Sequence, residues 1–347
     1  MSGMGSAPGW VVKLALVAVL TVCSVIILGS WTRLADAGLG CPDWPGCYGQ
    51  LIVPQTAEEI QLAESLYPDS PVEVGKGWLE MIHRYLATIL GFFILVIALG
   101  SWFYRRRLYY PFKHSQLLLA VVLMQGAFGA WTVTWKLWPQ IVTAHLFGGF
   151  ITASLLSILM LRLSRMGRQV RPLRLQHRRG GLRFWALIGL LLTSVQIFLG
   201  GWMSANYAAL ACSDLPACNG QWWPTMNFAE GFNLSQTIGP NYLGGLMDGE
   251  GRKAIHVIHR FMAVVLGIYL ILMARKLWQQ PDARLHLFAG LIMVLFAIQF
   301  LLGLANVYWH LPLPVAVAHN FGGACLFVTM MCLNYFLFSS RSRVSYE

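Results

Sequence analysis

Charged residues are scarce in this sequence. Asp, Glu, Lys and Arg together make up 11% of its 347 residues, whereas an ordinary soluble protein carries about 25%. Acids are the rarest, with 14 Asp and Glu against 25 Lys and Arg. So little charge excludes an ordinary water-soluble domain.

Long apolar runs take the place of the missing charge, since hydrophobic residues make up 57% of the chain. A run of about 20 such residues can cross the hydrocarbon core of a bilayer. No small-residue cleavage site follows the first run, so we expect it to remain a membrane span and not to be a signal peptide. The sequence predicts an all-α integral membrane protein. Its eight transmembrane helices are expected over residues 10–31, 79–104, 115–135, 142–162, 183–204, 254–276, 285–308 and 314–339.

The net charge of +11 is unevenly distributed between the loops. Basic residues gather in the segments 105–113, 162–183, 275–284 and 341–343, whereas most acids lie between 36 and 73 or between 214 and 250. Cytoplasmic loops are the ones enriched in Lys and Arg. We therefore predict that both termini face the cytoplasm, and we read the basic surplus as a topology signal that argues against nucleic-acid binding.

Four of the seven cysteines lie in two long outer loops, loops 1 and 3. Cys41 and Cys47 lie in the first, and Cys212 and Cys218 in the third. Two cysteines per loop fall short of the four ligands of a structural zinc site. An outer loop faces an oxidising compartment, where disulfides form.

The first half of the chain can be aligned with the second at an offset of 171 to 176 residues. An internal repeat of this kind predicts two similar structural units. Each unit has an even number of helices, so the two are parallel repeats about an axis along the membrane normal. We predict a four-helix half over residues 1–162, a basic cytoplasmic linker over 163–182 and a second four-helix half over 183–347. The matching segments are 28–31 with 199–202, 41–47 with 212–218, 82–85 with 258–261, Gln125 with Gln299, and 144–149 with 318–323.

Four histidines share one depth near the outer surface, because each lies in the first turn or two of an even-numbered predicted helix. They are His83, His145, His259 and His319. Paired imidazoles from facing helices suit the two axial positions of a heme iron. The simplest pairing is His83 with His145 and His259 with His319, although pairing across the halves is also open. Zinc or copper ligation and a purely structural polar network are the alternatives.

Glycine pairs follow two of these histidines by one turn, Gly148-Gly149 and Gly322-Gly323. Glycine lets a flat macrocycle approach the backbone closely. We therefore expect a heme to lie against these positions.

Arginines follow two of the histidines directly, as Arg84 and Arg260. A guanidinium suits a heme propionate bidentately, and the alternative is snorkelling to the membrane interface. Arg33 in the first outer loop is a weaker candidate for the same contact.

The repeat is broken at Glu80, which has His256 as its counterpart. Glu80 precedes His83 by three residues, so the two side chains lie on one helix face. A carboxylate there can transfer a proton or stabilise positive charge at an oxidised carbon. The alternative is that Glu80 pairs with Arg84 or caps the helix. We predict that one half holds a reacting heme, and the other a heme that transfers electrons.

The motifs together resemble the heme A synthase family over essentially the whole chain. They are Thr32-Arg33-Leu34 through Gly38-Leu39, Asp43-Trp44-Pro45, Glu-x-x-His-Arg at 80–84, and Ala-His-x-Phe-Gly-Gly at 144–149 and 318–323. The resemblance implies oxidation of the C8 methyl group of heme O to a formyl group, giving heme A. It implies that His83 and His145 hold the substrate heme and that His259 and His319 hold a resident heme b. Glu80 matches the catalytic glutamate of the family.

The same resemblance implies disulfides Cys41–Cys47 and Cys212–Cys218, with either a structural or a redox role. It implies heme O synthase as the substrate donor, cytochrome c oxidase assembly as the acceptor of the product, and a place in the bacterial plasma or inner membrane with the heme sites toward its outer side. The electron donor is unassigned, and a homo-oligomer is allowed. The alternative functions are a two-heme, quinol-linked electron carrier and a heme transporter or chaperone.

Overall fold

The computed structural model describes residues 7–107, 110–166, 173–175, 179–339 and 342–344. Eight helices in this part of the chain are long and apolar enough to cross a membrane, so the predicted all-α fold with eight spans is confirmed. They are α1 (Gly9–Leu34), α3 (Val74–Tyr104), α4 (Phe112–Thr134), α5 (Pro139–Arg165), α6 (Arg179–Ala205), α8 (Gly249–Trp278), α9 (Ala283–Tyr308) and α10 (Leu313–Ser339).

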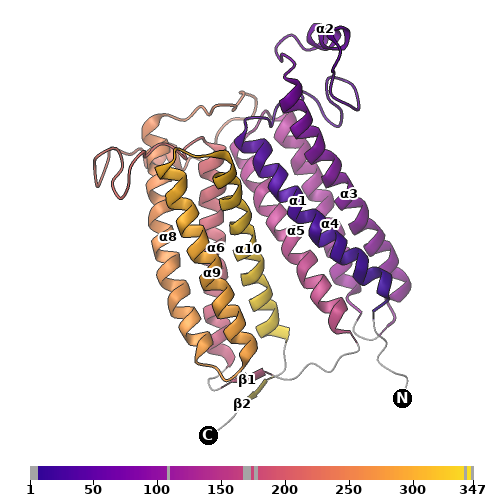
Figure 1. Ribbon diagram of the computed structural model, residues 1–347, viewed down its shortest axis with the longest axis vertical. Coiled ribbons are helices and arrows are strands. Elements are labelled where there is room, and N and C mark those ends of the chain that lie inside the picture. Colours follow the sequence, from indigo (N-terminus) through magenta and orange to yellow (C-terminus); the bar gives the residue numbers. More distant parts are fainter. Residues whose placement is uncertain (1–6, 108–109, 167–172, 176–178, 340–341, 345–347) are drawn as a thin grey trace.

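The eight helices form two rings of four. In one ring α1 packs on α3, α3 on α4, α4 on α5, and α5 returns to α1; α6, α8, α9 and α10 close a second ring in the same way. The rings meet where α10 contacts α1 and α5 and where α5 contacts α6. Figure 1 shows the rings side by side, with α1 beginning and α10 ending at the same end of the molecule.

The predicted boundaries at 162 and 183 stay a prediction. Residues 167–172 and 176–178 of the expected linker lie outside the described residues. Between these segments, β1 (Leu173–Leu175) pairs in parallel with β2 (Ser342–Val344), a short contact that the sequence did not predict.

All eight spans begin earlier than hydropathy indicated, and α3 and α8 do so by the most. Helix α3 begins at Val74 and α8 at Gly249, five residues before the predicted starts at 79 and 254. The turn added to α8, residues 249–253, is polar, and Asp248 caps it by accepting a hydrogen bond from the backbone N–H of Gly251 at 2.7 Å. Hydropathy detects the part of a helix that suits lipid, whereas the helix continues outward for as long as its backbone groups are bonded.

The outer loops contain two further helices, α2 (Ala57–Leu66) and the single turn α7 (Phe228–Gly231). The start of α2 carries a capping box in which Thr56 accepts from the Glu59 N–H and Glu59 accepts from the Thr56 N–H. This Thr-x-x-Glu spacing is readable in the sequence, although α2 was not among the predicted helices. Figure 1 places α2 at the end opposite the chain termini, beyond the ends of the long helices.

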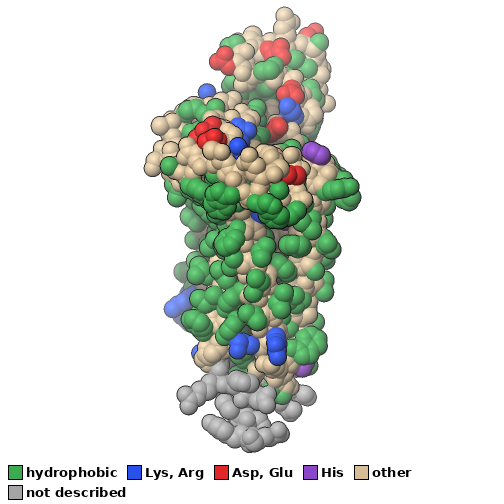
Figure 2. Space-filling view, turned by 90° about the vertical axis from the view of Figure 1, so that its left-hand side faces the viewer, with side chains coloured by type: hydrophobic (Ala, Val, Ile, Leu, Met, Phe, Trp, Pro, Cys, Tyr) green, Lys and Arg blue, Asp and Glu red, His purple; other side chains and the backbone are tan. Residues whose placement is uncertain are grey.

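The outer flank of the second ring is suited to lipid. Figure 2 shows hydrophobic side chains along its length, with acidic side chains gathered at the end of the outer loops. Lys and Arg lie among these acids and also near the opposite end, so on this face it is the acidic side chains that gather at one end.

Candidate functional site

Each of the four outer histidines lies against a glycine of a neighbouring helix. A methyl group at Gly29 would lie 2.7 Å from Cε1 of His83, and one at Gly200 would lie 3.2 Å from Cε1 of His259. The corresponding distances for the other two histidines are 3.3 and 3.4 Å. These glycines make room for the imidazole rings. The pairs are His83 with Gly29, His145 with Gly129, His259 with Gly200 and His319 with Gly303.

The histidines lie on the diagonals of the two rings. Helices α3 and α5, which carry His83 and His145, face each other across the first ring, and α8 and α10, which carry His259 and His319, face each other across the second. The structure therefore places the partners of each within-half pair on opposite helices of one ring, around a four-helix core of the kind that holds cofactors.

The residues fit a heme better than a zinc or copper ion. Among the residues that the structure describes, no three His, Cys, Asp or Glu side chains form a cluster able to hold a metal ion. A heme iron needs only two axial ligands from the protein, which is what each ring supplies.

Two glutamines occupy the glycine faces that we expected a macrocycle to use. The Gln125 side chain lies over Gly148, where a methyl group would be 2.3 Å from its Oε1, and Gln299 lies over Gly322 in the same way. Gln125 also donates from Nε2 to the backbone oxygen of His145 at 2.8 Å. Glycine is needed there so that an amide can reach the backbone of the helix that carries His145. The sequence matched these glutamines to each other but did not predict that they contact the glycines.

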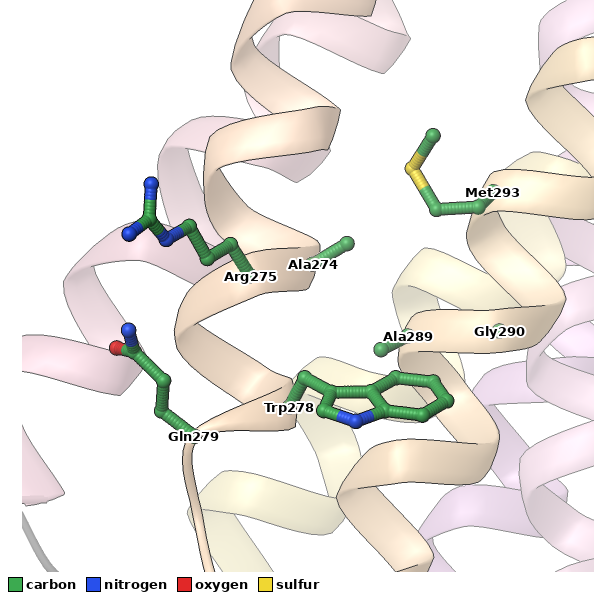
Figure 3. Close-up of a pocket in the computed structure, with 7 residues that line it drawn as sticks. All are labelled: Ala274, Arg275, Trp278, Gln279, Ala289, Gly290 and Met293. Atoms are coloured by element: carbon green, nitrogen blue, oxygen red, sulfur yellow. The ribbon is translucent and has the colours of Figure 1, made fainter.

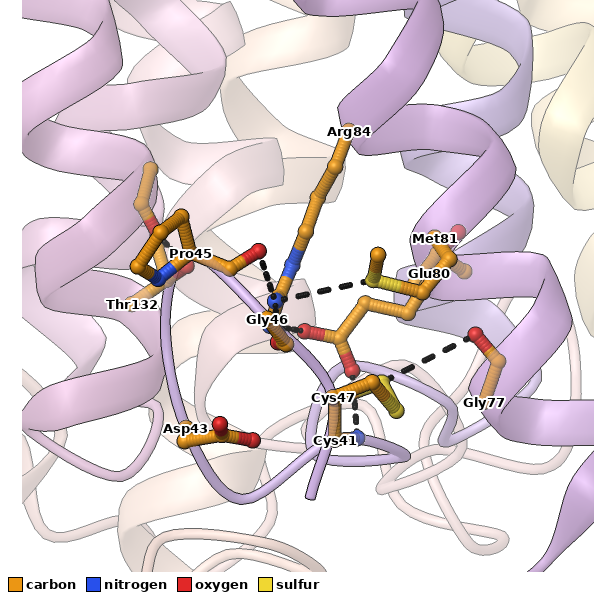
Figure 4. Close-up of polar contacts among 12 residues, drawn as sticks. Cys41, Asp43, Pro45, Gly46, Cys47, Gly77, Glu80, Met81, Arg84 and Thr132 are labelled. Atoms are coloured by element: carbon orange, nitrogen blue, oxygen red, sulfur yellow. Dashed lines mark hydrogen bonds and ion pairs between the residues drawn. A yellow bond between two sulfur atoms is a disulfide. The ribbon is translucent and has the colours of Figure 1, made fainter. Parts of the chain in front are cut away.

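Glu80 is buried, with 4% of its surface exposed. Its Oε2 accepts a hydrogen bond from the backbone N–H of Cys41 at 3.0 Å, and its Oε1 pairs with Arg84. Arg84 also donates to the backbone oxygen of Gly46 at 2.6 Å (Figure 4). The pairing of Glu80 with Arg84 that we left open as an alternative is thus present, and it connects Glu80 to the disulfide loop.

The second half repeats this loop with a different central residue. Arg260 donates to the backbone oxygens of Ala217 and Cys212 at 2.8 and 3.1 Å. His256, with 3% of its surface exposed, takes the place of Glu80 and donates from Nδ1 to the backbone oxygen of Ala208 at 3.0 Å. In this half Arg260 contacts the disulfide loop as Arg84 does in the first half, but the residue one turn before it is His256 and not a carboxylate.

The cysteines pair as expected, in the disulfides Cys41–Cys47 and Cys212–Cys218. Each loop is also held by an aspartate that accepts from two backbone N–H groups, Asp43 in the first and Asp214 in the second. In the second loop, the hydrogen bond from the N–H of Gly220 holds the pKa of the Asp214 carboxyl below its usual range.

Replacing Cys212 and Cys218 together by Ser is expected to lower the free energy of unfolding by about 2 kcal/mol, because a short cross-linked loop loses its constraint on the unfolded chain. Thermal unfolding of the purified protein measures the change. An unaltered unfolding midpoint would contradict a structural role for this disulfide.

Arg33 joins the two halves. Its guanidinium donates to the hydroxyl of Tyr207 at 2.7 Å and to the backbone oxygen of Ser204 at 2.6 Å, and it lies 4.3 Å from the centre of the Tyr207 ring. Tyr207 in turn donates to Asp36 at 2.8 Å. The sequence did not predict this contact between the end of α1 and the end of α6.

An open hollow of about 440 Å³ lies far from the histidines, between α8 and α9 (Figure 3). Arg275 and Trp278, in the last turn of α8, and Met293 of α9 line it. These residues are more than ten positions beyond His259 along α8, toward the end opposite the outer loops. This hollow takes no part in the histidine sites.

Comparison with known proteins gives matches over nearly the whole chain. The family model described as cytochrome oxidase assembly protein matches residues 12–331. A heme A synthase of Shewanella oneidensis is 43% identical over 342 residues, which cover 96% of this chain and 99% of that protein. Heme A synthases of Shouchella clausii and Maricaulis maris are each 27% identical and cover 92% and 91% of this chain, and 94% and 92% of their own lengths.

Proposed function

Because this chain belongs to the cytochrome oxidase assembly protein family, whose relatives above are heme A synthases, we propose that it oxidises the C8 methyl group of heme O to the formyl group of heme A. The chain is an enzyme of heme A biosynthesis, and it is integral to the membrane. The observation that carries the proposed chemistry is the position of Glu80. It lies one helical turn before His83, which shares the first ring with His145.

The substrate belongs in the first ring. His83 and His145 would hold the iron of heme O from opposite sides. The glycines behind them leave room for the two imidazoles to face the centre of the four-helix ring. With water as the source of oxygen, conversion of the methyl to a formyl group releases four protons and four electrons, and the electrons must pass to an acceptor outside the chain. The protein must therefore accept protons and stabilise positive charge near that carbon.

Glu80 is the group in the first half that suits this task. It is an acceptor held by the Cys41 N–H and by Arg84, so its position is fixed before the substrate binds. A fixed carboxylate in a site shielded from water favours charge that develops in the transition state, and it can accept a proton that leaves the carbon.

His259 and His319 would hold a resident heme b in the second ring. Heme b supplies one-electron redox chemistry when it is bound. His256 replaces the carboxylate in this half and donates its Nδ1–H to the backbone oxygen of Ala208, so an imidazole and not a carboxylate precedes His259.

The arginines divide between two tasks. Arg84 pairs with Glu80, and we assign it to holding the first disulfide loop. Arg33 bonds to Tyr207, and we assign it to the contact between the halves. Arg260 follows His259 directly, and in the part of the chain that the structure describes its guanidinium hydrogen-bonds to backbone oxygens, those of Ala217 and Cys212, and to no side chain. It is therefore the better candidate for a propionate.

The product links the chain to oxidase maturation. We propose that heme O arrives from heme O synthase, that heme A passes to cytochrome c oxidase during its assembly, and that both histidine pairs lie toward the outer side of a bacterial plasma or inner membrane. The acidic outer loops and basic opposite ends of the helices support that orientation.

Gly29→Val is expected to weaken heme O binding at least about tenfold, since even indirect disturbance of a metal ligand typically costs about 10–100-fold in affinity. The added side chain would overlap the His83 ring. Absorbance titration of the purified protein measures the affinity. Gly126→Val on α4 is the matched control, because a methyl group at Gly126 meets nothing within 4 Å. Equal affinities for the two variants would contradict the role of Gly29.

The function is tested by producing the chain in cells that make heme O but no heme A and extracting the membrane pigments. A formyl-bearing heme supports the proposed oxidation. An electron carrier or a heme transporter leaves the heme side chains unchanged, so recovery of heme O and heme b alone would support one of those functions instead.

A further inference from the structure

A segment of the second half is bonded to the first ring. This segment, the strap, consists of residues 234–242 of the third outer loop. The indole N–H of Trp138 donates to the backbone oxygen of Gln236 at 2.9 Å. Nε2 of Gln140 donates to the backbone oxygen of Leu234 at 3.1 Å. The strap therefore belongs to one half by sequence and holds side chains at the start of α5 in the other.

The strap is fixed near both of its ends. Tyr242 has only 4% of its surface exposed, and its backbone N–H donates to the backbone oxygen of Lys136 at 3.0 Å. The Tyr242 hydroxyl donates to the backbone oxygen of Thr237 at 2.6 Å. Gln236 donates from Nε2 to Oδ1 of Asn206, directly after α6, at 3.0 Å. The strap thus connects the end of α6 with the turn between α4 and α5.

The second half has no equivalent of the two side-chain donors. By the offset of 174 that relates the two Ala-His-x-Phe-Gly-Gly motifs, Trp138 and Gln140 align with Pro312 and Pro314. Proline has no side-chain donor. The indole of Trp309 beside this proline pair is 59% exposed. Side-chain anchoring of the helix start is therefore specific to the half that we assign to heme O.

We propose that Trp138 and Gln140 are positioning residues of the heme O site, which hold the start of α5 against the strap and thereby orient His145. This role rests on the proposed function, because it requires His145 to bind the iron of heme O. Many helices begin at a Ser, Thr, Asp or Asn that caps them. Helix α5 instead begins after Trp138, with Pro139 as its first residue, and its first side chains are bonded to the strap.

The anchored residues are close to the histidine along the helix. His145 follows Gln140 by five residues, or about 7–8 Å at 1.5 Å per residue. Helix ends fray, and a tethered start limits this motion two turns or less from the imidazole. Even indirect disturbance of a metal ligand typically costs about 10–100-fold in affinity. We therefore expect loss of the tether to weaken the binding of heme O and to leave heme b in place.

The experiment is an absorbance titration with heme O of the full-length protein, purified in nanodiscs with heme b bound. The double variant Trp138→Phe, Gln140→Leu removes both donors. Its affinity for heme O is expected to fall at least about tenfold. Part of the bound heme O should change from a six-coordinate, low-spin spectrum to a five-coordinate, high-spin one, because His145 is no longer held as the second axial ligand. Heme b should stay low-spin and at its wild-type content.

Two variants serve as controls. Trp309→Phe makes the same change as Trp138→Phe at an exposed position of the second half, and it is expected to leave both hemes as in the wild type. Gln140→Lys keeps a donor at the start of α5, so it should preserve the low-spin spectrum of heme O. Gln140→Leu alone should show part of the high-spin change.

Wild-type affinity and spin state in the double variant would overturn the role of the strap while the proposed function stands. If the double variant also loses heme b, the single variants at Gln140 decide. A high-spin fraction with Leu and none with Lys supports the role, and identical spectra overturn it. Failure of the wild-type protein to bind heme O overturns the proposed function itself, so the two failures are distinguishable.

Discussion

Glu80→Gln is expected to lower turnover of heme O by about 10²–10⁴-fold, the usual contribution of a positioned acid or base, while heme b stays bound. The amide keeps the size of the carboxylate but loses its negative charge and its ability to accept a proton. Turnover is measured as formation of a formyl-bearing heme per bound heme b in the purified protein.

Glu73→Gln is the matched control for this substitution. Glu73 lies seven residues earlier, at the start of the same helix, and forms an exposed ion pair with Lys76 at 2.9 Å. Loss of such a pair costs about 0–1 kcal/mol, and turnover should be unchanged. If Glu80→Gln also turned over at the wild-type rate with both hemes bound, Glu80 would be only a structural partner of Arg84.

His259→Ala is expected to lower the bound heme b by more than about tenfold, because even the loss of an outer partner of a metal ligand costs about 10–100-fold in affinity. His83→Ala should instead keep heme b and lose binding of heme O. Heme b per protein molecule is measured from the absorbance of the extracted pigment.

His310→Ala is the control, since His310 is exposed and lies outside the ring cores. It should keep both the heme content and the turnover of the wild type. If His83→Ala and His259→Ala lost heme b equally, the separation into a substrate half and a resident-heme half would be wrong.

Hydropathy was enough to predict the eight spans, because the cost of exposing backbone and charge to lipid leaves long apolar helices as the main solution. The repeat and the depth of the four histidines were also predictable from the sequence. The placement of the histidines on opposite helices of each ring was not predictable, since sequence spacing does not specify which helices of a bundle are neighbours.

The contacts that the sequence did not reveal all depend on distant partners. Trp138 lies 98 residues from Gln236, and Arg33 lies 174 residues from Tyr207. Nothing local in the sequence indicates either contact. The pairing of Glu80 with Arg84, four residues later, was one of the alternatives that the sequence offered, whereas the hydrogen bond from the Cys41 N–H to Glu80 required the folded loop.

The central claim is that the half carrying Glu80 oxidises heme O. The most direct measurement supplies heme O to the purified wild-type and Glu80→Gln proteins, then extracts the hemes and identifies them by mass spectrometry. The account predicts a formyl-bearing heme from the wild type, and heme O with heme b from Glu80→Gln. Formation of the formyl heme at equal rates by both proteins, or by neither, would contradict it.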